Sequence, residues 1–283
     1  MNLYEQTVER LRTYNIKLRK GLSQNFLVND QVLNQIGDSL LIGKEDLILE
    51  IGAGLGILTG VLLKKAKHVI AVEVDRELHR VLSQELKGCD NLTLLQKDIL
   101  KFEPENYFIE KNWKAVGNLP YHLSGSILRW VLNHREHLNE CYFMLQKEVA
   151  ERICAAPGSK IYGVLSLLCQ YFTRPEILFI VSKDSFLPKP VVDSAFIRMI
   201  VKPREISSSL LFPSLVKHSF AQRRKTIYNN LKSWQVQSPE QWRKMLQGLN
   251  LDEKLRAEEV SLDSYIKMAD VLNGILNTTS RRV

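Results

Sequence analysis

The chain has 283 residues, of which 45% are hydrophobic and 25% charged; this suffices for one large domain plus a small one and argues against global disorder. Lysine and arginine exceed aspartate and glutamate by 39 − 31 = 8, so we expect an anionic partner. Four scattered cysteines form no CxxC pair, which argues against a zinc ribbon or a disulfide framework. Without a signal-peptide core or a membrane-length apolar run, a cytoplasmic protein is expected.

Short apolar runs alternate with helix-like stretches over the first 200 residues or so. The first runs are apolar throughout, which is typical of parallel strands covered by helices on both sides. The alternation predicts repeated βαβ units. We predict helices at 56–66, 76–87 and 124–133, and strands at 47–54, 68–75, 92–98, 114–120, 141–146, 176–181 and 194–200.

The pattern changes after Val201. KPREISSSLLFPS is rich in proline and serine, as linkers are, and no strand signal follows it. We therefore predict a boundary near 203–207, between an α/β domain at 1–203 and a helical domain at 207–283. The helices expected in the second domain are 214–232, 239–247, 252–257 and 262–276.

A glycine-rich segment, Gly52-Ala53-Gly54-Leu55-Gly56, follows the first of these strands. Glycine lets the backbone turn sharply and approach a ligand closely. Glu73 ends the next strand, 21 residues after Gly52, where a carboxylate can accept both hydroxyls of a ribose. An adenosine-containing cofactor is predicted, with NAD and S-adenosylmethionine as alternatives. Asp98 ends the third strand, where it could read an adenine amino group or serve as a helix N-cap.

The segment Asn118-Leu119-Pro120-Tyr121 ends the fourth strand, beside the expected position of the glycine loop. The Asn118 amide oxygen can accept a hydrogen bond, and Pro120 favours an extended Leu119 whose carbonyl is also left to accept. Two acceptors can hold both hydrogens of an exocyclic amine, and the ring of Tyr121, rather than its hydroxyl, can stack on a flipped base. This favours an amino methyltransferase over a dehydrogenase. The alternative is a simple strand-ending turn.

Six segments together resemble the S-adenosylmethionine-dependent ribosomal RNA adenine dimethyltransferases, most closely the small-subunit type. They are LSQNFL (22–27), EIGAGLGILT (50–59), GNLPYHLS (117–124), FMLQKEVAERI (143–153), FLPKPVVDSA (186–195) and FAQRRKT (220–226). The resemblance implies a Rossmann-like class I methyltransferase sheet, mostly parallel with an antiparallel final hairpin, and a small all-helical C-terminal domain. Ala53 and His122 depart from the commonest pattern, which has proline and asparagine or glutamine there.

The resemblance also implies S-adenosyl-L-methionine as cofactor and a set of site residues. Those that match the cofactor positions are Asn25, Leu27, Gly52, Gly54, Glu73, Asp98 and Asn118. Phe186 matches an aromatic residue that packs on the face of the target adenine opposite Tyr121, and its alternative role is a hydrophobic loop anchor. With Asn118, Leu119 and Pro120, these two aromatic residues form the expected catalytic set.

Two basic clusters are candidates for phosphate contacts, although a solvated helix face is the alternative for each. They are Arg223, Arg224 and Lys225, and, near the N-terminus, Arg10, Arg12, Lys17, Arg19 and Lys20. No metal site is expected, because His134-Arg135-Glu136 resembles the HxE of a zinc deaminase but the partner PCxxC is absent.

The resemblance implies dimethylation of N6 in two adjacent adenosines of a hairpin loop near the 3′ end of 16S rRNA. The partner would be the assembling small ribosomal subunit, with no membrane partner, and we expect a monomer. A resistance-type methylase of large-subunit RNA and a non-catalytic RNA-binding assembly factor are the alternatives.

Overall fold

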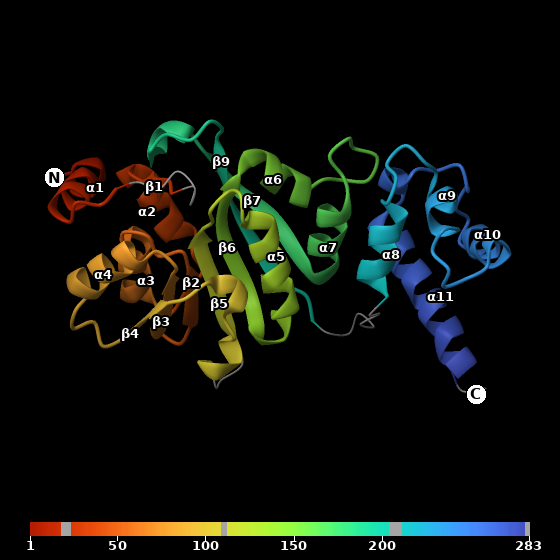
Figure 1. Ribbon diagram of the computed structural model, residues 1–283, viewed down its shortest axis with the longest axis horizontal. Coiled ribbons are helices and arrows are strands. Elements are labelled where there is room, and N and C mark those ends of the chain that lie inside the picture. Colours follow the sequence, from red (N-terminus) through yellow and green to blue (C-terminus); the bar gives the residue numbers. More distant parts are fainter. Residues whose placement is uncertain (18–23, 109–111, 204–210, 281–283) are drawn as a thin grey trace. The chain divides into compact units, whose positions relative to one another are not determined.

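A seven-stranded, mostly parallel sheet is the framework of the protein in this computed structural model, which describes residues 1–17, 24–108, 112–203 and 211–280. The strand order is β4-β3-β2-β5-β6-β9-β7 (Figure 1). Neighbours among the first five strands are parallel, β9 is antiparallel to β6, and β7 lies at the edge. All seven predicted strands are confirmed: β2 (Leu47–Ile51), β3 (His68–Glu73), β4 (Leu92–Gln96), β5 (Trp113–Asn118), β6 (Leu138–Gln146), β7 (Thr173–Val181) and β9 (Ser194–Val201).

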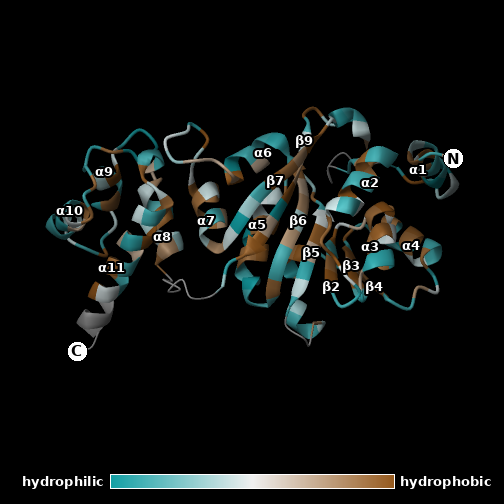
Figure 2. Ribbon diagram, turned by 180° about the vertical axis from the view of Figure 1, so that it is seen from behind, coloured by the Kyte–Doolittle hydropathy of each residue, from teal (hydrophilic) through white to brown (hydrophobic). Residues whose placement is uncertain are grey.

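Three predicted helices follow strands of the parallel part, namely α3 (Ile57–Lys65), α4 (Arg76–Glu85) and α5 (Ser124–Asn133). Local chemistry sets their starts: the Asp75 side chain accepts hydrogen bonds from the first backbone amides of α4. β2 and β3 are almost wholly buried, as their continuous apolar runs predict, and the hydrophobic colouring in Figure 2 runs through the central strands. The spacing did not predict α1 (Leu3–Thr13), α2 (Asp30–Ser39) or α7 (Val164–Phe172).

A small second sheet joins two segments that lie far apart in the sequence. β1 (Phe26–Leu27) pairs antiparallel with β8 (Phe186–Leu187), and the Val28 amide donates to the Ser185 carbonyl over 2.8 Å. Two-residue strands give no periodic signal, so this pairing was not predicted. It places the QNFL segment against the FLPKP segment.

The chain divides into two compact units, Met1–Ala150 with Pro175–Val201 and Glu151–Arg174 with Lys202–Val283. The break after Val201 adjoins the predicted boundary at 203–207, of which 204–210 lie outside the described residues. The prediction differs in placing 151–174 with the α/β part. They belong to the helical unit because Tyr171 stacks on Phe212, with ring centroids 3.7 Å apart, inside its core.

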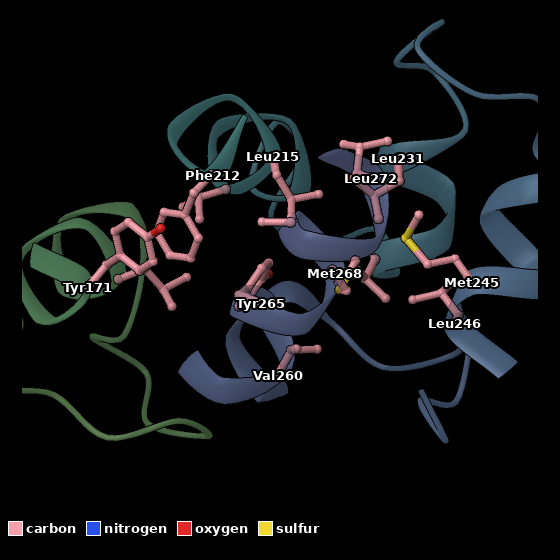
Figure 3. Packing of buried hydrophobic residues seen from close by; sticks show 14 of the residues in the cluster. Tyr171, Phe212, Leu215, Leu231, Met245, Leu246, Val260, Tyr265, Met268 and Leu272 are labelled. Atoms are coloured by element: carbon pink, nitrogen blue, oxygen red, sulfur yellow. The ribbon is translucent and has the colours of Figure 1, made fainter. Parts of the chain in front are cut away.

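The second unit packs its helices around a core of its own (Figure 3). Its helices include α6 (Lys147–Ile153) in part, α7, α8 (Phe212–Ser219), α9 (Ile227–Leu231), α10 (Pro239–Gly248) and α11 (Leu262–Ser280). Trp242, Tyr265 and Leu272 are fully buried there. None of the helices in the described ranges is long and apolar enough to cross a bilayer.

Two of the predicted C-terminal helices are wrong. The predicted helix 214–232 is interrupted by a loop, because Thr226 caps a new helix by accepting from the Asn229 amide. The predicted helix 252–257 is a turn that precedes the short 3₁₀ helix Ala257–Glu259. There the Asp252 side chain accepts from the Lys254 amide over 2.8 Å, a local bond that competes with helix formation.

Gly117 in β5 lets the backbone of this strand lie close to the end of the neighbouring strand β2. A Cβ atom at this position would lie 2.6 Å from the Ile51 carbonyl oxygen and 3.3 Å from Ile51 Cβ. β5 could therefore not lie so close to the end of β2 with any larger residue.

We predict that Gly117→Ala lowers the free energy of unfolding by about 1–3 kcal/mol, the usual cost of overpacking. Gly125→Ala in α5 is the matched control, since no neighbour lies within 4 Å of its added Cβ and alanine favours a helix by up to about 1 kcal/mol. Urea unfolding of both variants tests this. Equal stability of Gly117→Ala and the parent protein would contradict the prediction.

Candidate functional site

A cavity of about 270 Å³ lies at the carboxyl ends of the parallel strands. A smaller cavity of about 60 Å³ shares Gly52, Gly54 and Asn118 with it and is also lined by Leu27 and Phe186. The two cavities bring together every site residue predicted in the first unit. Those lining the larger one are Asn25, Gly52, Gly54, Glu73, Asp98, Asn118, Leu119, Pro120 and Tyr121.

The glycine loop between β2 and α3 has a conformation that its glycines make possible. Gly52, Gly54 and Gly56 have φ angles of 73°, 60° and 78°, values that other residues rarely adopt. Three left-handed residues within five positions reverse the chain between strand and helix. The loop therefore presents backbone, with little side chain, to both cavities.

Glu73 links the end of β3 to this loop. Its Oε2 accepts a hydrogen bond from the Gly54 amide and its Oε1 accepts one from the Asp75 amide, both over 2.8 Å. Burial raises the pKa of Glu73, whereas these backbone donors act in the opposite direction. Each carboxylate oxygen has a further lone pair, so Glu73 can hold the loop and still accept hydrogen bonds from a ligand.

A second buried carboxyl group, that of Glu50, lies in β2 just before the loop and lines the smaller cavity. Burial raises the pKa of Glu50 to about 8, and the charge of Glu73 acts in the same direction. Glu50 is therefore mainly protonated at pH 7. Of these two carboxyl groups, Glu73 is the one that accepts a hydrogen bond from the backbone of the glycine loop.

Apolar side chains form walls of the larger cavity. Val74 is 54% exposed and Leu100 38% exposed although both are large and hydrophobic, and both line the cavity with Ile99. Such surfaces suit a flat aromatic ligand. These residues were not predicted from the sequence. Only their positions could have indicated them, since Val74 follows Glu73 and Ile99 and Leu100 follow Asp98.

Asp98 has the alternative role that the sequence left open. Its Oδ1 accepts from the Leu100 amide over 3.0 Å and caps the 3₁₀ helix Ile99–Lys101. The N-cap role is thus confirmed. The side chain also lines the larger cavity, so capping and ligand contact are compatible.

The Asn118 side chain is oriented by a segment far from it in sequence. Its Nδ2 donates to the Asn25 carbonyl over 2.9 Å, which leaves Oδ1 as the acceptor of the amide. The Leu119 amide donates to the Met144 carbonyl over 3.1 Å and fixes the turn against β6. Among the described residues, no recorded hydrogen bond ends on the Leu119 carbonyl. Neither of the two predicted acceptor oxygens therefore receives a hydrogen bond from another described residue.

Tyr121 lines the larger cavity, and its hydroxyl lies 2.6 Å from the Ser194 hydroxyl. Burial raises the pKa of Tyr121, so the phenol is protonated at neutral pH. The prediction assigned importance to the ring alone, but the hydroxyl has a partner as well. Ser194 was not predicted, although it belongs to the FLPKPVVDSA segment and begins a strand whose other residues are apolar except for Arg198.

Phe186 is only 3% exposed and belongs to the main hydrophobic core of the sheet, together with Leu27, Met144 and Phe196. It lines the smaller cavity and not the one lined by Tyr121. Its burial supports the alternative role, a hydrophobic anchor of the loop that carries it.

The N-terminal basic cluster is partly structural. Arg10 donates from Nη1 to the carbonyl of Leu55 in the glycine loop over 3.1 Å, and its Nη2 lies 3.3 Å from Glu85 Oε2. Arg12 and Lys17 are exposed. Arg19 and Lys20 lie outside the described residues. Arg10 therefore supports the glycine loop, which its sequence context did not indicate.

The second basic cluster lies in the loop between α8 and α9, in the helical unit. Arg223, Arg224 and Lys225 are all exposed, although Arg223 donates to the Lys160 carbonyl. The loop is held by the buried Asn230, which donates to the Ser219 carbonyl over 2.7 Å and accepts from the Gln222 amide over 3.2 Å. The three cations thus sit on a structured loop rather than on a helix face.

Within the described part of the chain, one group of side chains has ligand atoms close enough together for a cation, namely Glu103, Glu105 and His134. Both carboxylates are exposed, and His134 Nε2 lies 3.8 Å from Glu103 Oε2. Exposed acidic groups commonly lie this close together without a metal ion. None of the three lines the larger cavity.

Comparison with known proteins agrees with this geometry. The ribosomal RNA adenine dimethylase family matches residues 15–274. Ribosomal RNA small subunit methyltransferase A is 39% identical in Clostridium botulinum (95% of this chain, 99% of the relative) and 39% identical in Ligilactobacillus salivarius (93% and 92%).

Two solved structures share the fold over 88% of the chain. A dimethyladenosine transferase from Plasmodium falciparum, 26% identical, has a TM-score of 0.76 and is covered over 98% of its length. The 23S rRNA methyltransferase ErmE, 23% identical, has a TM-score of 0.68, is covered over 100% of its length and supports the fold alone. The fold is that of a class I methyltransferase, and the chain belongs to the ribosomal RNA adenine dimethylase family.

Proposed function

We propose that the protein transfers methyl groups from S-adenosyl-L-methionine to N6 of two adjacent adenosines in 16S rRNA, two to each base. The target would be a hairpin loop near the 3′ end of this RNA in assembling small subunits, in the cytoplasm. The observation that carries the proposal is one cavity lined by the glycine loop, Glu73 and the Asn118–Tyr121 segment. The small-subunit names of the relatives that match nearly the whole chain support the choice of RNA.

The chain's residues fit this cofactor. The Glu73 carboxylate can accept the ribose hydroxyls, and the apolar walls at Val74 and Leu100 suit the adenine ring. We assign the smaller adjoining cavity, lined by Leu27, Gly52 and Gly54, to the amino-acid end. The cofactor supplies a methyl group already activated by its sulfonium, so no nucleophilic side chain is required.

The remaining task of the protein is to position a weakly nucleophilic amine, whose lone pair is delocalised into the adenine ring. Asn118 Oδ1 and the Leu119 carbonyl can accept the two hydrogens of this amine and favour a tetrahedral nitrogen. Pro120 keeps the second acceptor in place by restricting Leu119. Tyr121 supplies the stacking face. Catalysis then rests on alignment and on preorganised dipoles.

We assign the stacking face to Tyr121, which lines the larger cavity, whereas Phe186 lines the smaller cavity from within the core. Its place in the core instead keeps β8 paired with β1, next to the cofactor segment.

The alternative functions have less support. The FAQRRKT segment and the names of the relatives favour small-subunit RNA over large-subunit RNA. A non-catalytic assembly factor would have no need for acceptors at Asn118 and Leu119 beside an intact glycine loop.

Removal of this protein from its cells should abolish dimethyladenosine in 16S rRNA and leave 23S rRNA unchanged. Mass spectrometry of nuclease-digested RNA from both subunits, with and without the gene, measures both. Cells complemented with the wild-type chain are the control. Persistence of the modification in 16S rRNA would contradict the proposed substrate.

Glu73→Ala should weaken the affinity for S-adenosylmethionine by about 1.5–3 kcal/mol, because a charged acceptor for the ribose disappears. The hydrogen bond that holds Gly54 is lost with it. Titration calorimetry measures the affinity, with Asp90→Ala, an exposed acidic residue of the same unit, as control. Wild-type affinity in Glu73→Ala would remove this residue from the cofactor site.

Replacing Arg223, Arg224 and Lys225 together by alanine should weaken binding to small-subunit RNA and flatten its salt dependence. Each lost phosphate contact reduces the log–log slope by about 0.7–0.9. The affinity for the cofactor should be unchanged. A control variant with Lys244, Lys254 and Lys267 replaced by alanine removes the same charge from exposed positions of the same unit. Equal slopes for the two variants would show that net charge, rather than this loop, matters.

A further inference from the structure

The hydrogen bond between Tyr121 and Ser194 joins two segments that are distant in sequence. Tyr121 follows β5, whereas Ser194 is the first residue of β9 and is fully buried. Ser194 pairs with Gln146 in the antiparallel β6–β9 ladder, so the sheet holds its position. We propose that Ser194 is a positioning residue of the methyl transfer, which holds the Tyr121 ring in place before the target base arrives. The proposal rests on the stacking role of Tyr121 proposed above.

The backbone end of Tyr121 is held independently of Ser194. The Tyr121 carbonyl accepts from the Ser124 hydroxyl over 2.9 Å, and the Pro120 carbonyl accepts from the Leu123 amide over 3.0 Å. These bonds close the turn that leads into α5. The main chain at Tyr121 therefore cannot shift easily, and the remaining freedom of the ring is rotation of its side chain.

The hydroxyl bond removes most of this freedom. A tyrosine side chain can swing about its Cα–Cβ bond between staggered rotamers, which would carry the ring away from the cavity. A hydrogen bond of 2.6 Å at the far end of the ring opposes that swing. Rotation about the Cβ–Cγ bond leaves the hydroxyl in place, so packing alone limits it. The bond thus fixes where the ring lies.

A fixed ring matters because the reaction depends on alignment. The amine must meet Asn118 Oδ1 and the Leu119 carbonyl, and a displaced stacking surface would tilt the base away from them. A ring fixed in advance also avoids the entropy cost of ordering it when RNA binds. Ser194 should therefore affect the methyl-transfer step and leave cofactor binding unchanged.

The experiment compares Ser194→Ala, Tyr121→Phe and the double variant of the full chain. Single-turnover methylation of unmethylated small subunits is measured at saturating S-adenosylmethionine, with cofactor affinity measured separately by calorimetry. Ser194→Ala should slow methylation roughly two- to tenfold, the effect of one lost hydrogen bond, at unchanged cofactor affinity. Tyr121→Phe removes the same bond from the other side and should slow it equally. The double variant should be no slower than either single variant.

Ser219→Ala is the matched control. Ser219 is also fully buried and donates one hydrogen bond, to the Leu215 carbonyl over 2.8 Å, within the helical unit. Its loss should lower thermal stability without the coupling to Tyr121→Phe. A general loss of stability is thereby separated from an effect on the ring.

Two results would overturn the proposal. One is a wild-type methylation rate in Ser194→Ala, and the other is losses that multiply in the double variant, because Ser194 would then act by another route. Tyr121→Ala distinguishes the stacking role of Tyr121 from the role of its hydrogen bond to Ser194. If Tyr121→Ala slows methylation while Ser194→Ala does not, the stacking role is supported and only the positioning role of Ser194 is contradicted. If Tyr121→Ala methylates at the wild-type rate, the stacking role fails as well.

Discussion

The hydrogen bond from the Gly54 amide to the buried Glu73 carboxylate is the interaction on which the site depends. It joins the glycine loop after β2 to the end of the neighbouring strand β3. The Gly54 amide can point toward Glu73 because the glycines of the loop adopt left-handed φ angles. Burial opposes ionisation of Glu73 and the backbone donors favour it. A carboxyl group held in this way can bind the loop and a ligand together.

Around this bond, segments from three parts of the sequence form one site. The Asn25 carbonyl accepts from Asn118, and β1 next to it pairs with β8. The segments that we propose for cofactor and base binding therefore contact each other directly. The smaller cavity is lined by Gly117, where a side chain would meet the Ile51 carbonyl. Positioning of this kind suits a reaction whose methyl donor is already activated.

The residues proposed for methyl transfer and the exposed basic loop belong to different units. The glycine loop and the Asn118–Tyr121 segment belong to the first unit, and the loop with Arg223, Arg224 and Lys225 belongs to the second. The second unit has a hydrophobic core of its own, and the buried Asn230 shapes its basic loop. Arg10 shows why charge alone is a poor guide to RNA contacts, because its guanidinium is engaged by Leu55 and Glu85.

The sequence alone determined the seven strands, the glycine loop and the meeting of Gly52, Glu73 and Asn118, because apolar periodicity and the carboxyl-end rule for parallel sheets are local or topological signals. It failed where side chains redirect the backbone, as at Thr226 and Asp252. Only the tertiary structure showed the β1–β8 pairing, the burial of Phe186 and the bond between Tyr121 and Ser194. These depend on distances between residues far apart in the chain, and no local pattern encodes such distances.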